Sequence, residues 1–113
     1  MTATNLGFDT VISFTAYTKN EKEFKKYENE LSKQISYYNK IFDRYNSYEG
    51  INNIKTINDN AGKKPVEVNE DIIDLLTISK EYAELTNGKF DITLGSVMDL
   101  WREAREQAEK NPD

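Results

Sequence analysis

The chain has 113 residues, of which 37% are hydrophobic and 31% are charged, and its formal net charge is −5. This size and composition suit one modest domain with a thin core, and the acidic balance disfavours nucleic-acid binding, which needs clustered Lys and Arg. The chain contains no Cys and no His, which excludes thiol catalysis, disulfides, Cys/His zinc sites and His-based triads within it. Any bound metal would therefore need oxygen ligands.

The first half of the chain is expected to form one strand followed by one long helix. Residues 8–17 alternate between apolar and polar side chains, which is typical of a half-buried strand. Asn20 followed by Glu23 is a variant of the capping box and marks the start of a helix. Apolar and aromatic side chains then recur every three or four residues, which predicts a long amphipathic helix. Its predicted buried stripe is Phe24, Tyr27, Leu31, Ile35, Tyr38, Phe42 and Tyr45.

The middle of the chain is expected to hold a short helix and an extended piece. Residues 46–50 break the long helix, and isoleucines at helical spacing over residues 51–57 indicate one or two helical turns. Residues 58–62 are interpreted as a turn, and residues 65–68 as a short extended segment. Residues 52–60 are rich in Asn but lack the pattern of a calcium-binding EF-hand loop. The preference of Asn and Asp for turns is therefore the better explanation of this composition. Its polar residues are Asn52, Asn53, Asn58, Asp59 and Asn60.

Two further helices are expected at the C-terminal end. Asn69 can cap the first of them, and Asn87-Gly88 is predicted to end it in a left-handed cap. The last helix is expected from about Ser96 and becomes polar nearly all round beyond Trp101. No apolar run approaches the length needed to span a membrane, and no signal peptide is visible. Residues 1–113 are thus interpreted as α+β.

Two short segments, at Tyr45 and at Asp91 with Thr93, each allow a structural and a functional interpretation. Tyr45, the last member of the stripe, either belongs to the core or presents its ring and hydroxyl to a planar ligand. Asp91 and Thr93 precede the last helix, where they either cap its free N–H groups or form a turn that faces a ligand. Gly88 and Gly95 would allow a bound group to approach the backbone closely, and no general acid–base pair is specified.

Four pieces of the sequence occur in a characteristic order: residues 8–11, residues 42–45, residues 57–62 followed by 65–68, and residues 88–101. Together they resemble the N-terminal part of the ApbE family, the FAD:protein FMN transferases formerly called thiamine biosynthesis lipoproteins. The block over residues 88–101 is the most specific of them, and the resemblance covers essentially the whole chain but only about the first third of a typical family member.

The resemblance implies Mg²⁺-dependent phosphoryl transfer, in which FAD is cleaved between its phosphates and AMP is released. FMN is attached through its phosphate to a Thr or Ser hydroxyl of a target flavoprotein, typically a subunit of a membrane redox complex. Family members are often lipoproteins anchored by an N-terminal Cys outside the cytoplasmic membrane. That Cys is not in this chain, so this chain itself is expected to be soluble.

The resemblance carries over FAD contacts residue by residue. Phe8 falls where the family commonly has the Met of a Met-Gly-Thr motif, and Asp9 replaces the Gly of that motif. Asp91 is the firmest of the matched contacts, whereas Gly95 and Trp101 match as scaffold. The residues assigned to FAD are Phe8, Tyr45, Lys89, Phe90 and Asp91.

The family's Mg²⁺ ligands, its basic and His contacts to FAD and a Gly-rich segment are all expected beyond Asp113. The chain is therefore interpreted as an N-terminal fragment or a truncated paralogue of a larger ApbE-like fold, inactive without the missing C-terminal portion. Neither FAD nor Mg²⁺ is expected to bind tightly to it. Two alternatives are a flavin-binding module without catalysis and a helical interaction module that does not bind flavin.

Overall fold

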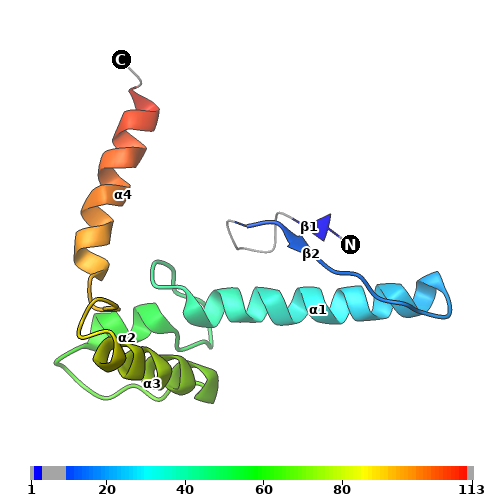
Figure 1. Cartoon of the computed structure of the whole chain (residues 1–113), viewed down its shortest axis with the longest axis horizontal. Coiled ribbons are helices and arrows are strands. Elements are labelled where there is room, and N and C mark those ends of the chain that lie inside the picture. The colour runs from blue at the N-terminus through cyan, green and yellow to red at the C-terminus, as the bar shows by residue number, and fades with distance from the viewer. Residues whose placement is uncertain (1, 4–9, 112–113) are drawn as a thin grey trace. The chain divides into compact units, whose positions relative to one another are not determined.

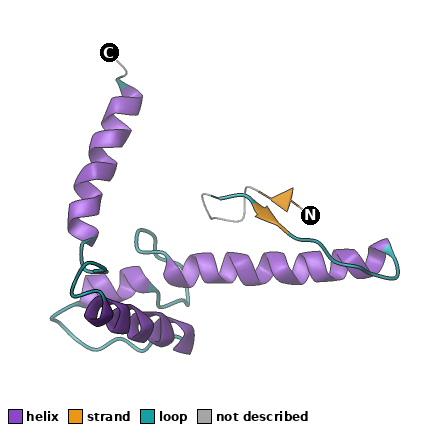
Figure 2. Ribbon diagram, viewed as in Figure 1, coloured by secondary structure: helices purple, strands orange, loops and turns teal. Residues whose placement is uncertain are grey.

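The computed structural model describes residues 2–3 and 10–111, and this part of the chain is mostly helical (Figures 1 and 2). The chain divides into two compact units, residues 1–73 and residues 74–113, with the boundary inside the third helix. The helices follow the predicted order. The described elements are β1 (Thr2–Ala3), β2 (Ile12–Ser13), α1 (Glu21–Phe42), α2 (Ile54–Asn60), α3 (Glu70–Leu85) and α4 (Gly95–Lys110).

Regular β structure in the described residues is limited to one antiparallel pair, β1 with β2. Thr2 lies opposite Ser13 and Ala3 lies opposite Ile12. Within the described residues, the strand predicted over residues 8–17 is paired with β1 at Ile12 and Ser13. The first two residues of that prediction lie outside the described part, and the α+β class stays a prediction.

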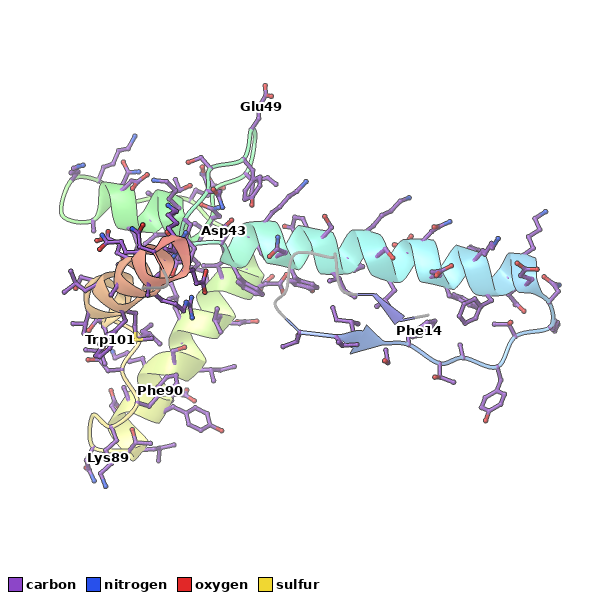
Figure 3. All side chains as sticks on the ribbon, turned by 90° about the horizontal axis from the view of Figure 1, so that it is seen from above. Phe14, Asp43, Glu49, Lys89, Phe90 and Trp101 are labelled. Atoms are coloured by element: carbon purple, nitrogen blue, oxygen red, sulfur yellow. The ribbon has the colours of Figure 1, made fainter. Side chains whose placement is uncertain are left out.

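The alternation predicted for this segment is present in the burial of its side chains. Ile12, Phe14 and Ala16 are half-buried, whereas the residues between them are exposed. The ring of Phe14 lies 5.9 Å from that of Phe24 in α1, so aromatic packing adds to the two-residue ladder (Figure 3).

The predicted cap begins α1 with one difference in its hydrogen bonds. The Asn20 side chain accepts the Glu23 N–H at 3.0 Å, and the Glu23 carboxylate accepts the Lys19 N–H at 2.9 Å. In a standard capping box this second bond would go to the cap residue itself. The stripe is half-buried except for Tyr27 and Tyr45, which are exposed, and the fully buried residue of α1 is Ile41, which the prediction omitted.

The helix α2 continues to Asn60, so the turn predicted over residues 58–62 begins too early. Asn53 and Thr56 form a reciprocal capping box that fixes the start of this helix. An ion pair between Lys55 and Asp59, with Nζ and Oδ2 2.6 Å apart, lies along its exposed side. Asn58, Asp59 and Asn60 favour turns, but the capping box and the Lys55–Asp59 ion pair stabilise them as part of the helix.

The last two helices begin close to the predicted residues. Asn69 accepts the Asp71 N–H at 2.8 Å at the start of α3. The helix α4 begins at Gly95, one residue before the prediction, and its apolar side chains are open to solvent. Trp101, interpreted from the sequence as scaffold, is 72% exposed (Figure 3). No helix in the described residues combines the length and apolar character needed to cross a membrane.

Candidate functional site

Three of the predicted site residues share one turn. Lys89, Phe90 and Asp91 lie between α3 and α4 in the second unit, and all three are exposed. Lys89 and Phe90 are labelled in Figure 3. Tyr45 belongs to the first unit, in the loop that follows α1. Phe8 lies outside the described residues. The turn and the Tyr45 loop are therefore built by different local interactions.

The turn begins with the left-handed cap predicted at the end of α3. Asn87 has φ of 50° and Gly88 has φ of 76°. The Gly88 N–H donates to the Ala83 carbonyl at 2.8 Å, and the Asn87 N–H donates to the Glu84 carbonyl at 3.1 Å. This pair of bonds is the Schellman motif, which satisfies carbonyl groups that the helix end would otherwise leave unpaired. The prediction of a left-handed cap is confirmed.

The Thr86 hydroxyl connects this cap to the candidate residues. It donates to the Tyr82 carbonyl at 2.7 Å and accepts the Phe90 N–H at 3.0 Å. The Phe90 ring meets the Tyr82 ring edge-on, with centroids 6.2 Å apart. The backbone of Phe90 is thus held to the last turn of α3, while 43% of this residue's surface stays open to solvent.

Asp91 organises the second half of the turn. Its Oδ1 accepts both the Thr93 hydroxyl at 2.7 Å and the Thr93 N–H at 2.8 Å. The hydrogen bond from the Thr93 hydroxyl, and to a smaller extent that from the Thr93 N–H, lowers the pKa of Asp91. Asp91 is therefore ionised at neutral pH. No described residue donates to its Oδ2, and Asp91 is exposed. A charged carboxylate is therefore held in place with one oxygen available.

The helix-capping interpretation of Asp91 and Thr93 is wrong. The residue that caps α4 is Leu94, and no side chain makes a capping hydrogen bond there. The oxygen of Asp91 that could have reached a helix N–H is instead bonded within the turn, to Thr93. Bonding of an Asp to the N–H two residues on is characteristic of an Asx-turn.

Tyr45 is not a core residue. It is 44% exposed, and the guanidinium of its neighbour Arg44 lies over its ring, with Cζ 4.5 Å from the ring centroid. An Arg44 Nη2 also donates to the Tyr45 hydroxyl at 2.7 Å. The pair presents an aromatic ring and a positive charge together at the surface.

Asp43 holds the loop that carries Tyr45, a role that sequence reasoning missed. Its Oδ1 accepts the N–H groups of Tyr45 and Asn46 at 2.6 and 3.1 Å. Its Oδ2 accepts the Asn46 side-chain amide at 2.9 Å and the Tyr48 hydroxyl at 2.7 Å. Partial burial raises the pKa of Asp43, but these four bonds outweigh it and lower the pKa to about 2. An Asp directly after a helical pattern was the available signal for such a turn.

No group of three or more His, Cys, Asp or Glu side chains that could hold a metal ion occurs among residues 2–3 and 10–111. In the second unit, the turn offers an available carboxylate oxygen on Asp91 and the ammonium of Lys89. In the first unit, the loop after α1 offers the paired Arg44 and Tyr45. Each set of groups can hydrogen-bond to a ligand, and neither provides an acid–base pair.

Comparison with known proteins identifies the family. The model of the ApbE family matches residues 8–113, which is nearly the entire chain and includes both the Tyr45 loop and the turn at Asp91. Searches of curated proteins and of solved structures gave no match. The match over residues 8–113 shows that this chain belongs to the ApbE family.

Proposed function

We propose that this chain supplies part of the FAD site of an FAD:protein FMN transferase. The observation that carries the proposal is the ordered turn at residues 88–93, where an ionised, exposed Asp91 stands beside the partly exposed ring of Phe90. The family match supports it, because this turn lies within the matched segment. The proposed acceptor of FMN is a Thr or Ser of a flavoprotein subunit in a membrane redox complex. The whole transferase is proposed to be a lipoprotein located outside the cytoplasmic membrane.

The side chains of the turn fit the chemistry of FAD. The flavin ring system is planar and carries an N–H donor, so an exposed aromatic ring and a carboxylate oxygen are suitable partners for it. The Lys89 ammonium suits a phosphate oxygen, and it is exposed on the same turn. These residues would bind and orient FAD, and they take no part in proton transfer.

Mg²⁺, when bound, would neutralise charge on the diphosphate of FAD. Residues 2–3 and 10–111 gather no metal-binding cluster, and none of them is assigned to the ion. The resemblance implies that the family's metal ligands follow the motifs matched here. We therefore propose that the 113 residues alone bind FAD weakly and do not transfer FMN.

The binding part of the proposal can be tested residue by residue. Titration of FAD into the isotopically labelled chain, followed by amide NMR shifts, is expected to move the signals of residues 88–93 and 44–46 with an affinity of about millimolar. Asp91→Ala should weaken the shifts, whereas Asp74→Ala, which removes another exposed carboxylate of the same unit, should not. Shifts that avoid both segments would contradict the assignment.

The catalytic part is tested by incubating the chain with FAD, Mg²⁺ and a target flavoprotein subunit, and measuring covalent flavin on the target by mass spectrometry. No transfer is expected. Turnover by the 113-residue chain would refute the proposed inactivity without affecting the assignment of the FAD contacts.

A second candidate function is a helical interaction module without flavin binding. Exposed apolar side chains on α4 favour it, since Val97, Leu100 and Trp101 are 48%, 68% and 72% exposed. This alternative predicts that FAD moves no amide signal at any concentration, and that the chain associates with another protein or with itself. The same NMR titration therefore separates the two functions.

A further inference from the structure

The chain contains a single Asn-Gly dipeptide, Asn87-Gly88, and the structure places it in the cap that ends α3. An Asn followed by Gly is the dipeptide most prone to deamidation, because Gly has no side chain to hinder attack by its own backbone nitrogen. Asn87 is exposed, and no described residue hydrogen-bonds its side-chain amide. The electrophilic carbon is thus open to attack.

We propose that Asn87 is a deamidation site of this chain and that opening of the α3 cap controls its rate. The Gly88 nitrogen loses its proton to a base in solution and attacks Cγ of Asn87. The new N–Cγ bond forms as the Cγ–Nδ2 bond breaks, and ammonia leaves after taking a proton from water. Water then opens the resulting succinimide at either carbonyl, which gives aspartate or isoaspartate at position 87.

The cap protects the attacking nitrogen. The Gly88 N–H is donated to the Ala83 carbonyl at 2.8 Å, so the proton that must leave is held in a short hydrogen bond. The nitrogen becomes reactive only when this bond opens, and helix ends open far more readily than helix centres. Protection of the dipeptide therefore depends on the local stability of the cap.

The Thr86 hydroxyl is the main side-chain support of the cap. It bonds the Tyr82 carbonyl at 2.7 Å and the Phe90 N–H at 3.0 Å, one on each side of the dipeptide. Thr86→Val keeps the shape of the side chain and removes both bonds. The variant is expected to open the cap more often without changing the Asn-Gly sequence.

Modification would alter the adjoining turn. Either product adds a negative charge two residues before Lys89 and four residues before Asp91. Isoaspartate also inserts an extra backbone carbon at the residue that holds φ of 50°, which is incompatible with the two hydrogen bonds of the cap.

The experiment compares deamidation rates of the whole chain by peptide mapping and mass spectrometry at mildly alkaline pH. In the folded chain Asn87 is expected to react at least about tenfold more slowly than in the same chain unfolded in urea. Thr86→Val should raise the folded rate by at least about fivefold, since the loss of each hydrogen bond corresponds to about that factor, and should leave the urea rate unchanged. Circular dichroism verifies that the variant is folded.

Asn58 is an internal control, because it is exposed but is followed by Asp59 and not by Gly. It should stay unmodified in both states. Equal rates at Asn87 in folded and unfolded chains, or an unchanged folded rate in Thr86→Val, would overturn control by the cap. Absence of reaction at Asn87 even in urea would overturn the site itself.

Discussion

Asp43 is the residue on which the loop after α1 depends, because its two oxygens accept four hydrogen bonds within five residues of chain. Its pKa in the folded chain is lowered from the ordinary value of 3.8 to about 2. A lowered pKa means that the folded state favours the ionised form. The stabilisation by Asp43 is therefore complete when the pH is above the pKa of Asp43 in the unfolded chain. It is lost as the pH falls through the pKa of Asp43 in the folded chain.

We predict that the free energy of unfolding falls by about 1 kcal/mol between about pH 5 and pH 2 through Asp43 alone, a figure reduced because solvent screens this partly exposed group. Urea unfolding at the two pH values measures the change. Asp43→Asn should remove that part of the pH dependence, while Asp74→Asn, on an exposed face of α3, should retain it. An undiminished pH dependence in Asp43→Asn would contradict the assignment.

For single residues, the sequence indicated which side chains could form hydrogen bonds more reliably than it indicated which groups they contact. Tyr45 was open to two interpretations because helical spacing alone does not reveal whether the last member of a stripe still faces the core. Asp91 suits both a helix cap and an Asx-turn, since either uses the same oxygen. The choice depends on which N–H lies nearby, and that N–H belongs to Thr93.

Among the elements, α2 depends most on one side chain. Asn53 is fully buried, and its amide donates to the carbonyls of Lys40 and Asn46 at 3.0 and 2.8 Å. Its Oδ1 accepts the N–H and the hydroxyl of Thr56, both at 3.1 Å. One side chain thus joins the end of α1, the following loop and the start of α2 within the first unit.

Asn53→Ala is therefore predicted to destabilise the chain by about 2–3 kcal/mol, since it removes the helix cap and leaves two carbonyls without a partner. Thermal or urea unfolding followed by circular dichroism measures the loss. Asn58→Ala is the matched control within the same helix. Its side chain is exposed and makes no hydrogen bond to the described residues, so it should change stability by less than about 0.5 kcal/mol. Equal effects of the two substitutions would refute the role of Asn53.

The helices were predictable because their signals are local. Asn20 and Asn69 cap where the sequence indicated, and Asn87-Gly88 ends α3 as predicted. The pairing of the strand predicted over residues 8–17 was harder to predict, because the partner of Ile12 and Ser13 in the described residues is β1, which no local pattern identifies. The end of α2 was also misplaced, since Asn and Asp favour turns unless a cap and an ion pair extend the helix through them.

Across the whole molecule, the thin core expected from composition is confirmed for the described residues. The fully buried apolar side chains there are Ile41 and Ile72, both in the first unit. Trp101 was interpreted as scaffold from its match to the family motif, yet it is 72% exposed. Exposure cannot be deduced from residue type alone, because one apolar side of a helix is equally compatible with a core or with an open surface.

This distribution of burial predicts that a small change at a buried residue destabilises the chain more than a large change at an exposed one. Ile41→Val removes one methylene from a side chain that is 1% exposed and should cost about 1 kcal/mol. Trp101→Ala removes the largest side chain of the chain, yet it should cost less than about 0.5 kcal/mol, because that residue is 72% exposed. Urea unfolding followed by circular dichroism compares both without depending on Trp fluorescence. If Trp101→Ala were the more destabilising substitution, α4 would have to be packed in solution, and the apolar surface assigned to it would not be available to a partner.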